Sequence, residues 1–511
     1  MNRYKFDIIV AGSGFAGSIA ALALGRIGLS VCLIEKSSHP RFAVGESSTP
    51  LADMILRSFS ERYGLPFLSG LSRYGSWQKS HPDILCGIKR GFSYYAHNRG
   101  EQYKTGRDNP NELLVAASSN DSDSDTNWFR SDVDSFLVQK VLEAGIVYLD
   151  KTSVVRKTDR DAVLELEAVR DNSRLMLECE LLIDATGSPR LASDLFGVSS
   201  SSGHFHTNSF SLYSHFRGVE RWSRVLHEYG YYTGRYPYDP DHSALHHLLR
   251  EGWMWNLRFN NDLLSAGFVI DRTGSASMRD GELRDDRKNI NKWEALVSGY
   301  PSIQKSFSGA KLARTPGKII QTGRLQRKMN RICGENWIAL NHTAGFVDPL
   351  HSTGIAHTLH GLERTLDIVA DSWGRKKEMR QRFALHQTSF YRELELIDLL
   401  VAGCYMSRTH FKLFHAYSMI YFACTISCEQ DRLAGKITGD FLGAGDEKIQ
   451  NMVRETFSEL QSMTAAGISG SSIVAFMDAV RERIEPWNTA RLLNPERRNR
   501  YDHTAVSLDN R

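Results

Sequence analysis

Three glycines near the start of the chain have the spacing of a dinucleotide-binding turn. Gly12, Gly14 and Gly17 form the pattern G-x-G-x-x-G, and Glu35 follows at the distance expected of an acid that binds a ribose hydroxyl. The first glycine permits a tight turn, the second lets the backbone approach a pyrophosphate, and the third lets helix and strand pack closely. The N-terminus of the following helix offers unpaired N–H groups to the phosphates. These residues therefore predict a bound dinucleotide, NAD or FAD.

A single lysine stands in a segment that otherwise predicts a buried strand. Residues 86–97 are CGIKRGFSYYAH, with Lys89 between a glycine and a run of aromatic residues. Burial would lower the pKa of this amine and suit it to chemistry. The alternative is a lysine whose ammonium group reaches solvent from a half-exposed strand. Lys79, in the polar segment SWQKSH, is a rival candidate. Phe92 and Tyr94 alternate along the strand, so they line a ligand or pack within the sheet.

The elements that must position these residues follow the order of a Rossmann-type domain. Residues 5–36 predict a strand, the glycine turn, a helix and a second strand that ends near Glu35, and the first strand is continuously apolar. A second helix is predicted over residues 51–64 and a polar, acidic surface loop over 118–127. Alternating strands are predicted over 146–184.

Changes of pattern along the chain predict its domains. Residues 1–205 and 331–372 form the dinucleotide-binding domain, and 206–330 form a separate antiparallel sheet with aromatic-rich strands. Residues 373–490 are predicted to be helical, and 491–511 are predicted to form a basic, loose tail.

Composition limits the possible partners. A length of 511 residues predicts two or three packed subdomains. The net charge of +4 gives no reason to expect nucleic acid or an anionic membrane as a partner. The seven cysteines are sparse and lack metal-ligand spacing, so we expect no metal site and reduced thiols in a cytoplasmic protein. We expect no signal peptide, and the apolar segment LFHAYSMIYFACTIS is short for a membrane span.

Two later segments favour FAD over NAD. LLIDATGSPR places Asp184 after an apolar strand, and WIALNHTAGFVDPLHSTGIAHTLHG places Asp348 and a second glycine turn before a helix over 353–365. Here the sequence resembles the FAD monooxygenase superfamily of the p-hydroxybenzoate hydroxylase type. The resemblance implies that this helix start lies against the flavin ring, where it would stabilise the anionic reduced flavin. Where the family has Gly-Asp, this chain has Asn341-His342. Asn341 could still bind a hydroxyl, but reduced affinity for FAD is expected.

Four segments narrow the resemblance to flavin-dependent halogenases. In chain order they are HPRFAVGESSTP, CGIKRGFSYYAH, EGWMWNLRFNN and TAGFVDPLHSTG. The sequence is most similar to the branch that acts on free phenolic substrates, which includes phloroglucinol and tetracycline chlorinases. The resemblance implies an α/β fold, in which a Rossmann-type FAD-binding domain carries an inserted antiparallel-sheet substrate domain and a helical C-terminal region.

The same resemblance implies a reaction and its partners. Reduced FAD (FADH2), dioxygen and a chloride or bromide ion would yield hypohalous acid, and Lys89 would pass its halogen to a small, electron-rich aromatic substrate. Backbone amides of Thr353 and Gly354 would hold the halide, although Ser352 or Thr353 could simply cap the helix. His351 would orient or deprotonate a phenol, or pack as a structural residue. Reduced flavin would come from a separate NAD(P)H-dependent reductase, because the sequence holds no second dinucleotide fingerprint. A homodimer is also expected.

The remaining site residues are implied by the resemblance as well. Those expected to bind the cofactor are Gly12, Gly14, Phe15, Ala16, Gly17, Glu35, Arg41, Glu46, Ser47, Arg130, Asp184, Asp348, Gly354 and Ile355. Those expected along the path to the substrate are Phe92, Tyr94, Trp253 and Trp255. Arg41, Glu46 and Arg130 could equally form structural ion pairs. The two tryptophans share one face of a strand and could be ordinary core residues.

Two departures, Asn341-His342 and Leu257-Arg258, keep other reactions open. The family segment W-x-W-x-I-P ends here in Leu257-Arg258, and this region is thought to suppress ordinary oxygenation. The alternatives are an FAD-dependent aromatic hydroxylase or oxidase on the same fold, and a flavoprotein-like module that binds an aromatic metabolite without catalysis.

Overall fold

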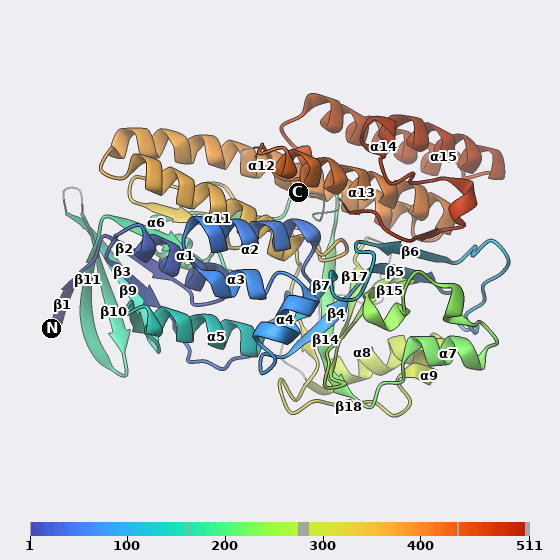
Figure 1. Cartoon of the computed structure of the whole chain (residues 1–511), viewed down its shortest axis with the longest axis horizontal. Helices are drawn as coiled ribbons and strands as arrows, with labels where there is room; N and C mark the ends of the chain where they lie inside the picture. Colours follow the sequence, from blue (N-terminus) through green and yellow to red (C-terminus); the bar gives the residue numbers. More distant parts are fainter. Residues whose placement is uncertain (1, 161–162, 274–285, 437–438, 506–511) are drawn as a thin grey trace.

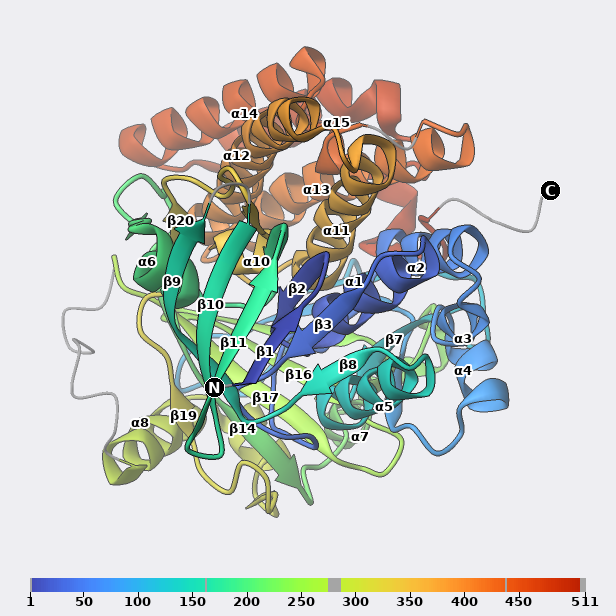
Figure 2. The ribbon, with the colours of Figure 1, turned by 90° about the vertical axis from the view of Figure 1, so that its left-hand side faces the viewer.

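The computed structural model describes residues 2–160, 163–273, 286–436 and 439–505 of the chain. A parallel sheet with its helices occupies one end of the molecule, a large mixed sheet occupies the other, and long C-terminal helices run across both (Figure 1). Seen from the first end, the helices form a layer above the sheets (Figure 2). This arrangement confirms the predicted fold class.

The parallel sheet carries the glycine turn. Its central strand β2 is apolar and buried throughout, as a strand covered on both faces must be. Helix α1 (Phe15–Arg26) begins directly after the turn. A Cβ atom at Gly17 would lie 1.8 Å from the Gly12 carbonyl oxygen, so only glycine permits this approach. In spatial order the strands are β21 (Trp337–Ala339), β12 (Leu181–Asp184), β2 (Ile8–Ala11), β3 (Val31–Ile34) and β8 (Val147–Leu149).

Two smaller sheets flank this domain. The first contains the alternating strands predicted after residue 146, and the second includes β20, the strand that precedes β21 in the chain. The first consists of β1 (Asn2–Lys5), β11 (Ser173–Cys179), β10 (Val163–Arg170) and β9 (Thr152–Arg160). The second consists of β13 (Ser200–Ser201), β20 (Arg327–Met329) and β22 (Gly345–Phe346).

The large sheet is more extensive than predicted. It takes strands from before and after residues 206–330, and β15 pairs in parallel with β5. The expectation of a separate antiparallel sheet confined to 206–330 is therefore wrong in extent. In spatial order the strands are β18 (Lys311–Leu312), β14 (Ser209–Arg217), β17 (Leu264–Asp271), β16 (Gly252–Arg258), β15 (Ala244–Leu249), β5 (Gly91–Ala96), β6 (Glu112–Ala116) and β23 (Arg500–Tyr501), and β19 (Ile320–Gln321) pairs with β14.

Helices cover these sheets. The long helix α11 contacts both α1 and α2, and α12 and α13 pack against one another above it. The helices of the first half are α2 (Pro50–Arg62), α3 (Pro66–Gly70), α4 (Tyr74–Ser80), α5 (Arg130–Glu143), α6 (Arg190–Phe196) and α7 (Trp222–Glu228). Those of the second half are α8 (Asp286–Ser298), α9 (Pro301–Ser306), α10 (Asn341–Ala344), α11 (Thr353–Ser372), α12 (Lys376–Ser407), α13 (Phe411–Leu433), α14 (Glu447–Ala466) and α15 (Gly470–Ile484).

The predicted surface loop over 118–127 ends inside the protein. Strand β7 (Asp125–Trp128) is fully buried and pairs antiparallel with β4 (Cys86–Lys89), with Asp125 opposite Lys89. Residues 119–122 are exposed, as predicted for a surface loop, whereas residues 124–127 are buried.

The prediction of a loose tail over 491–511 is wrong for its described part. Leu492, Leu493 and Tyr501 are buried, and β23 adds to the edge of the large sheet beside β6. Residues 506–511 lie outside the described residues.

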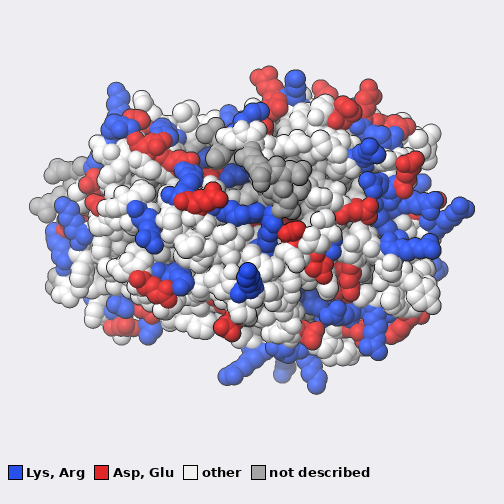
Figure 3. All heavy atoms as spheres, in the orientation of Figure 1, with Lys and Arg blue, Asp and Glu red and all other residues white. Residues whose placement is uncertain are grey.

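The surface and the thiols bear on the expected partners. Acidic and basic side chains are interspersed on the face shown in Figure 3. All seven cysteines are free thiols. Among the helices that the structure describes, none has both the length and the apolar character of a membrane span.

Tyr501 tests whether the C-terminal segment is part of the core. Its hydroxyl accepts a hydrogen bond from the Leu493 N–H at 2.9 Å, and its ring is buried. Tyr501→Ala should lower the free energy of unfolding by about 3–5 kcal/mol, measured by urea denaturation, because it leaves a cavity and an unpaired donor. The matched control is Tyr232→Ala, since Tyr232 is 78% exposed. Equal stability of the two variants would show that the segment is not core.

Candidate active site

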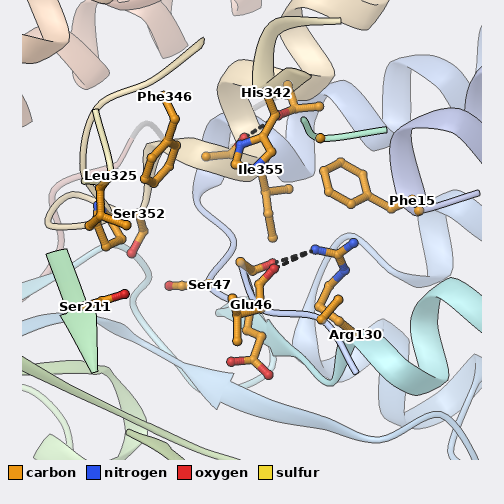
Figure 4. Close-up of a pocket in the computed structure, with 18 of the residues that line it drawn as sticks. Phe15, Glu46, Ser47, Arg130, Ser211, Leu325, His342, Phe346, Ser352 and Ile355 are labelled. Carbon is orange, nitrogen blue, oxygen red and sulfur yellow. Dashed lines mark hydrogen bonds between the residues drawn. The ribbon is translucent and has the colours of Figure 1, made fainter. Parts of the chain in front are cut away.

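A cavity of about 420 Å³ lies where the carboxyl edge of the parallel sheet meets the large sheet and the start of α11. Figure 4 shows Ile355 and Ser47 pointing into it, with Phe15 and Arg130 on one side and Ser211 on the other. The site is therefore built from both sheets and one helix N-terminus. Its lining also includes Gly14, Ala16, Arg41, Glu46, Gly187, His246, Trp253, Trp255, Leu257, His342, Phe346, Ser352 and Gly354.

Glu35 lies at the end of β3, as predicted, and it holds the glycine turn. Its carboxylate accepts hydrogen bonds from the Ser13 N–H at 3.1 Å and from the Ser37 N–H at 3.0 Å. The carboxylate does not line the cavity, and neither do Gly12 and Gly17. These three residues therefore shape the turn from behind, while Gly14 faces the cavity.

Two arginines bring positive charge to the turn. The Arg41 guanidinium lies 3.7 Å from the Glu35 carboxylate and 3.8 Å from that of Asp134. Arg130 pairs with both oxygens of Asp134 and donates to the carbonyl of Gly45 at 3.2 Å. Both arginines line the cavity beside Gly14, so they can face a pyrophosphate there.

Asp184 and Asp348 are buried and do not line the cavity. Asp184 accepts from the N–H and the hydroxyl of Thr186, and burial raises its pKa to about 6. Asp348 accepts hydrogen bonds from the hydroxyls of Ser209 and Tyr405, both at 2.9 Å, and burial raises its pKa to about 7. Through these bonds Asp348 holds the loop before α11 against the large sheet and α12. Direct contact of Asp348 with the flavin is therefore not supported.

The start of α11 faces the cavity without a cap. Ser352 adopts a left-handed conformation with φ 53°, and no side chain caps the helix. Ser352, Gly354 and Ile355 line the cavity, whereas Thr353 does not. The alternative that Ser352 or Thr353 caps the helix is therefore wrong, and the N–H groups of the first turn remain available to an anion.

The Asn341-His342 pair is divided between core and cavity. Asn341 is fully buried and donates to the His357 carbonyl at 3.0 Å in α11, so it is wrong as a hydroxyl ligand. His342 faces the cavity instead. Burial lowers its pKa to about 3, with Arg327 and Arg130 acting in the same direction. The imidazole is therefore neutral where the family has an acid.

The two tryptophans of β16 stand beside one another on the cavity wall, with ring centroids 6.1 Å apart. Leu257 continues this wall. Arg258 points away from the cavity, since its guanidinium lies 3.6 Å from the Asp241 carboxylate and donates to the Val219 carbonyl at 3.2 Å. The charge at position 258 therefore stabilises a neighbouring loop and does not enter the site.

Lys89 is fully buried, which rules out the solvated alternative. Its ammonium group donates to the Ser48 carbonyl at 2.7 Å, lies 3.5 Å from the Asp125 carboxylate, and stands 4.2 Å above the Phe92 ring. Lys89 does not line the cavity, but its acceptor Ser48 directly follows Ser47, which does.

An aromatic cluster adjoins both the cavity, through His246, and Lys89, through Phe92. His246 lines the cavity and stacks on Tyr94, with ring centroids 4.8 Å apart. His351 stacks on Tyr421 at 4.2 Å, and its Nε2 lies 3.6 Å from the Cys404 sulfur. Neither His351 nor the predicted tunnel residues Phe92 and Tyr94 line the cavity itself.

The sequence alone did not single out His246, because neither histidine in the strand ALHHLL belongs to a recognisable motif. Only the parallel pairing of β15 with β5 brings it opposite Tyr94. The Glu46 carboxylate contacts His215 Nε2 at 2.9 Å, which agrees with the structural pairing given as the alternative to cofactor binding. Glu46 also lines the cavity.

The residues at the turn fit an FAD molecule. A Cβ atom at Gly14, which lines the cavity, would lie 3.4 Å from the Arg130 guanidinium and 3.6 Å from that of Arg41, so bare backbone and two cations meet where a pyrophosphate needs close approach. The Ser47 hydroxyl is buried, lines the cavity and has no hydrogen-bond partner among the described residues. Gly14, Phe15, Ala16, Arg41, Arg130 and Ile355 would hold the cofactor.

Comparison with known proteins identifies the family. The Tryptophan halogenase profile matches residues 7–61 and 129–408. Monodechloroaminopyrrolnitrin halogenase PrnC of Pseudomonas fluorescens is 28% identical over 82% of this chain and 71% of its own length. Tetracycline 7-halogenase of Kitasatospora aureofaciens is 26% identical over 82% of this chain and 73% of its own length. The chain belongs to the tryptophan halogenase family.

The structural comparison agrees with this family. The crystal structure of halogenase PltM aligns with a TM-score of 0.85 at 22% identity, over 97% of this chain and 99% of that chain. A second PltM structure contains phloroglucinol and FAD and aligns with a TM-score of 0.83 at 22% identity, over 98% of this chain and all of that chain. The chain is therefore a flavin-dependent halogenase with FAD as its cofactor, and the predicted family and cofactor are confirmed.

Replacing His342 by the acid of the family pattern is predicted to increase the affinity for FAD. His342→Asp should tighten FAD binding roughly tenfold, because a hydrogen bond to a charged group contributes about 1.5–3 kcal/mol. The nearby Arg327 guanidinium would balance the new carboxylate. Titration of flavin fluorescence measures the effect, with His342→Asn as the uncharged control. If the Asp and Asn variants bind FAD equally, the cofactor does not contact this position through a hydroxyl.

Proposed function

We propose that the chain is a two-component halogenase of an electron-rich, phenolic aromatic. Reduced FAD comes from a separate NAD(P)H-dependent reductase, and Lys89 directs hypohalous acid to the substrate. The full burial of Lys89 against an aromatic cluster that adjoins the cavity is the observation that carries the proposal.

The overall reaction balances with these reactants. One reduced FAD, one dioxygen, one halide, one proton and one aromatic C–H give oxidised FAD, one aromatic C–X bond and two waters. Reduced FAD with dioxygen and halide supplies hypohalous acid. In the second part, a ring electron pair forms the C–X bond, the O–X bond breaks, and the hydroxide leaves as water after taking up a proton.

The aromatic cluster supports a phenolic substrate. Trp253 and Trp255 offer ring faces, and Nδ1 of both His246 and His351 and the Tyr94 hydroxyl are buried without hydrogen-bond partners in the described chain. Burial lowers the pKa of both histidines to about 3, so both are neutral and can accept a hydrogen bond from a phenol. A planar substrate with a hydroxyl group could donate to His246, which is the one of these three residues in the cavity lining.

The start of α11 supports a halide site at Gly354. A partial positive charge lies at the N-terminus of this long helix, and its first turn is uncapped. A Cβ atom at Gly354 would meet only the Phe346 ring, at 4.0 Å, so the backbone there is open to an anion. Thr353 would contribute only its N–H group.

The hydroxylase alternative loses its main support, because Arg258 is engaged away from the cavity. The two reactions differ in their products. With a reductase, bromide and a set of small phenols, mass spectrometry should find brominated product, and halide-free buffer should abolish it. Oxygenated product formed at an undiminished rate without halide would instead establish the hydroxylase.

Lys89 is tested by removing its amine. Lys89→Met should lower the halogenation rate by at least ~10²-fold, in the range for loss of a positioned proton donor. FAD binding should change little, but the melting temperature should fall, because the substitution leaves the Asp125 carboxylate buried without its cation, so the rate is measured on folded, FAD-loaded enzyme. The matched control is Lys79→Met, because Lys79 is exposed at the end of α4. A Lys89→Met enzyme with the rate of the control would remove the assignment.

A further inference from the structure

Two buried aspartates lie beneath Lys89, and neither belongs to the predicted site. Asp125 stands opposite Lys89 across the β4–β7 pair, with its carboxylate 3.5 Å from the amine. Asp53 lies in the first turn of α2, and its carboxylate accepts a hydrogen bond from the Ser48 hydroxyl at 2.8 Å. The Ser48 carbonyl in turn accepts from Lys89. The three ionisable side chains therefore form one cluster around Ser48, and all are buried.

Asp53 and Asp125 meet at Ser48 and Lys89, and two like charges buried this close do not both ionise. Burial raises the pKa of Asp53 well above its usual range, and Asp125 adds to this effect. Burial also raises the pKa of Asp125, but Lys89 opposes that shift. The Lys89 cation stabilises a carboxylate at Asp125, 3.5 Å away, which leaves the proton to Asp53.

Charge balance together with the contact between Lys89 and Asp125 favours one arrangement of protons. An ammonium at Lys89, a carboxylate at Asp125 and a neutral acid at Asp53 sum to zero charge inside the protein. A neutral amine beside one carboxylate and one acid would leave a net negative charge buried, and a buried net charge is strongly disfavoured. The Phe92 ring face 4.2 Å from the amine also favours a cation.

Charged and titratable groups on three elements face the cluster. Arg57 lies on α2 and donates to the Asp53 backbone carbonyl at 3.4 Å, and its charge lowers the pKa of Asp53, but by less than burial and Asp125 raise it. Tyr421 of α13 faces Asp125, and burial raises its pKa beyond the physiological range, so its hydroxyl is neutral. His246 of β15 faces Lys89 and is neutral as well.

We propose that Asp125 is a positioning residue that keeps Lys89 in its ammonium form, and that Asp53 carries the proton that allows Asp125 to remain ionised. This inference rests on the proposed function of Lys89. An ammonium has no lone pair, so it cannot form a haloamine. Two of its N–H bonds point to Ser48 and Asp125, and the third is left to donate to the oxygen of hypohalous acid.

The proposal defines the proton transfer of the second step. The ring electron pair forms the C–X bond as the O–X bond breaks, and the ammonium gives its third proton to the departing oxygen, which leaves as water. The ring carbon then loses its proton, which restores the ammonium. Atoms and charges balance, because hypohalous acid and an aromatic C–H give an aromatic halide and water.

The test compares two aspartates in one cluster. Asp125→Asn removes the carboxylate, so the pKa of Lys89 should fall by about 1 to 3 pH units. Asp53→Asn keeps an N–H donor to Asp125, so the pKa of Lys89 should stay within about half a unit of wild type. NMR of enzyme labelled with ¹⁵N-lysine reports this pKa directly, and Lys89→Met assigns the signal. The high-pH limb of the halogenation rate should move with the NMR value in Asp125→Asn and stay in place in Asp53→Asn.

Each outcome is decisive. An equal shift in both variants, or a neutral amine in the wild type at pH 7, overturns the proposal. If Asp125→Asn does not fold, infrared spectroscopy of the wild type still decides: a protonated carboxyl band that Asp53→Asn removes supports the proposal, and its absence overturns it. A wild-type enzyme with this band and a charged Lys89 that yields no halogenated product would contradict the proposed function while supporting the charge arrangement.

Discussion

A charged amine inside the protein requires a compensating carboxylate at close range, and the middle of the molecule is organised around that requirement. Strands β4 and β7 pair so that Lys89 and Asp125 stand opposite one another. The segment before α2 joins them, because the Ser48 N–H donates to the Thr126 carbonyl while its own carbonyl accepts from Lys89. A buried charge without these partners would destabilise the fold by several kcal/mol. The same contacts place the amine beside the cavity, so stability and chemistry depend on one arrangement.

The cavity depends on a second constraint, which is that both sheets end at the start of one helix. Asp348 connects that helix start to the large sheet through Ser209 and to α12 through Tyr405. Its contribution is mechanical, since it does not face the cavity. An uncapped helix start held in this way presents its N–H groups to the cavity at a fixed position. Anion binding at this point therefore follows from packing, without a dedicated positive side chain.

The departures from the family pattern are each compensated locally. Asn341 packs against α11, where its side-chain amide donates to the His357 carbonyl. His342 remains neutral beside Arg327, so no charge is buried without a partner. Arg258 replaces a proline, yet its charge pairs with Asp241 outside the cavity. Arg258 therefore adds no charge to the cavity wall that Trp253, Trp255 and Leu257 form.

The sequence by itself determined the glycine turn, the α/β class, the family, and Lys89 as the residue to examine, because these depend on local spacing and on contiguous motifs. Tertiary structure alone decided which predicted residues face the cavity. Thr353, Asp348 and Glu35 lie behind its wall, although each stands at the predicted place in the chain. It also decided the role of Asp125, which the polar segment 118–127 placed at the surface. Whether a side chain is buried, and which groups it contacts, depends on residues far apart in the sequence. Asp53, Lys89 and Asp125 come from three separate segments, and only their packing in the fold brings their charges together.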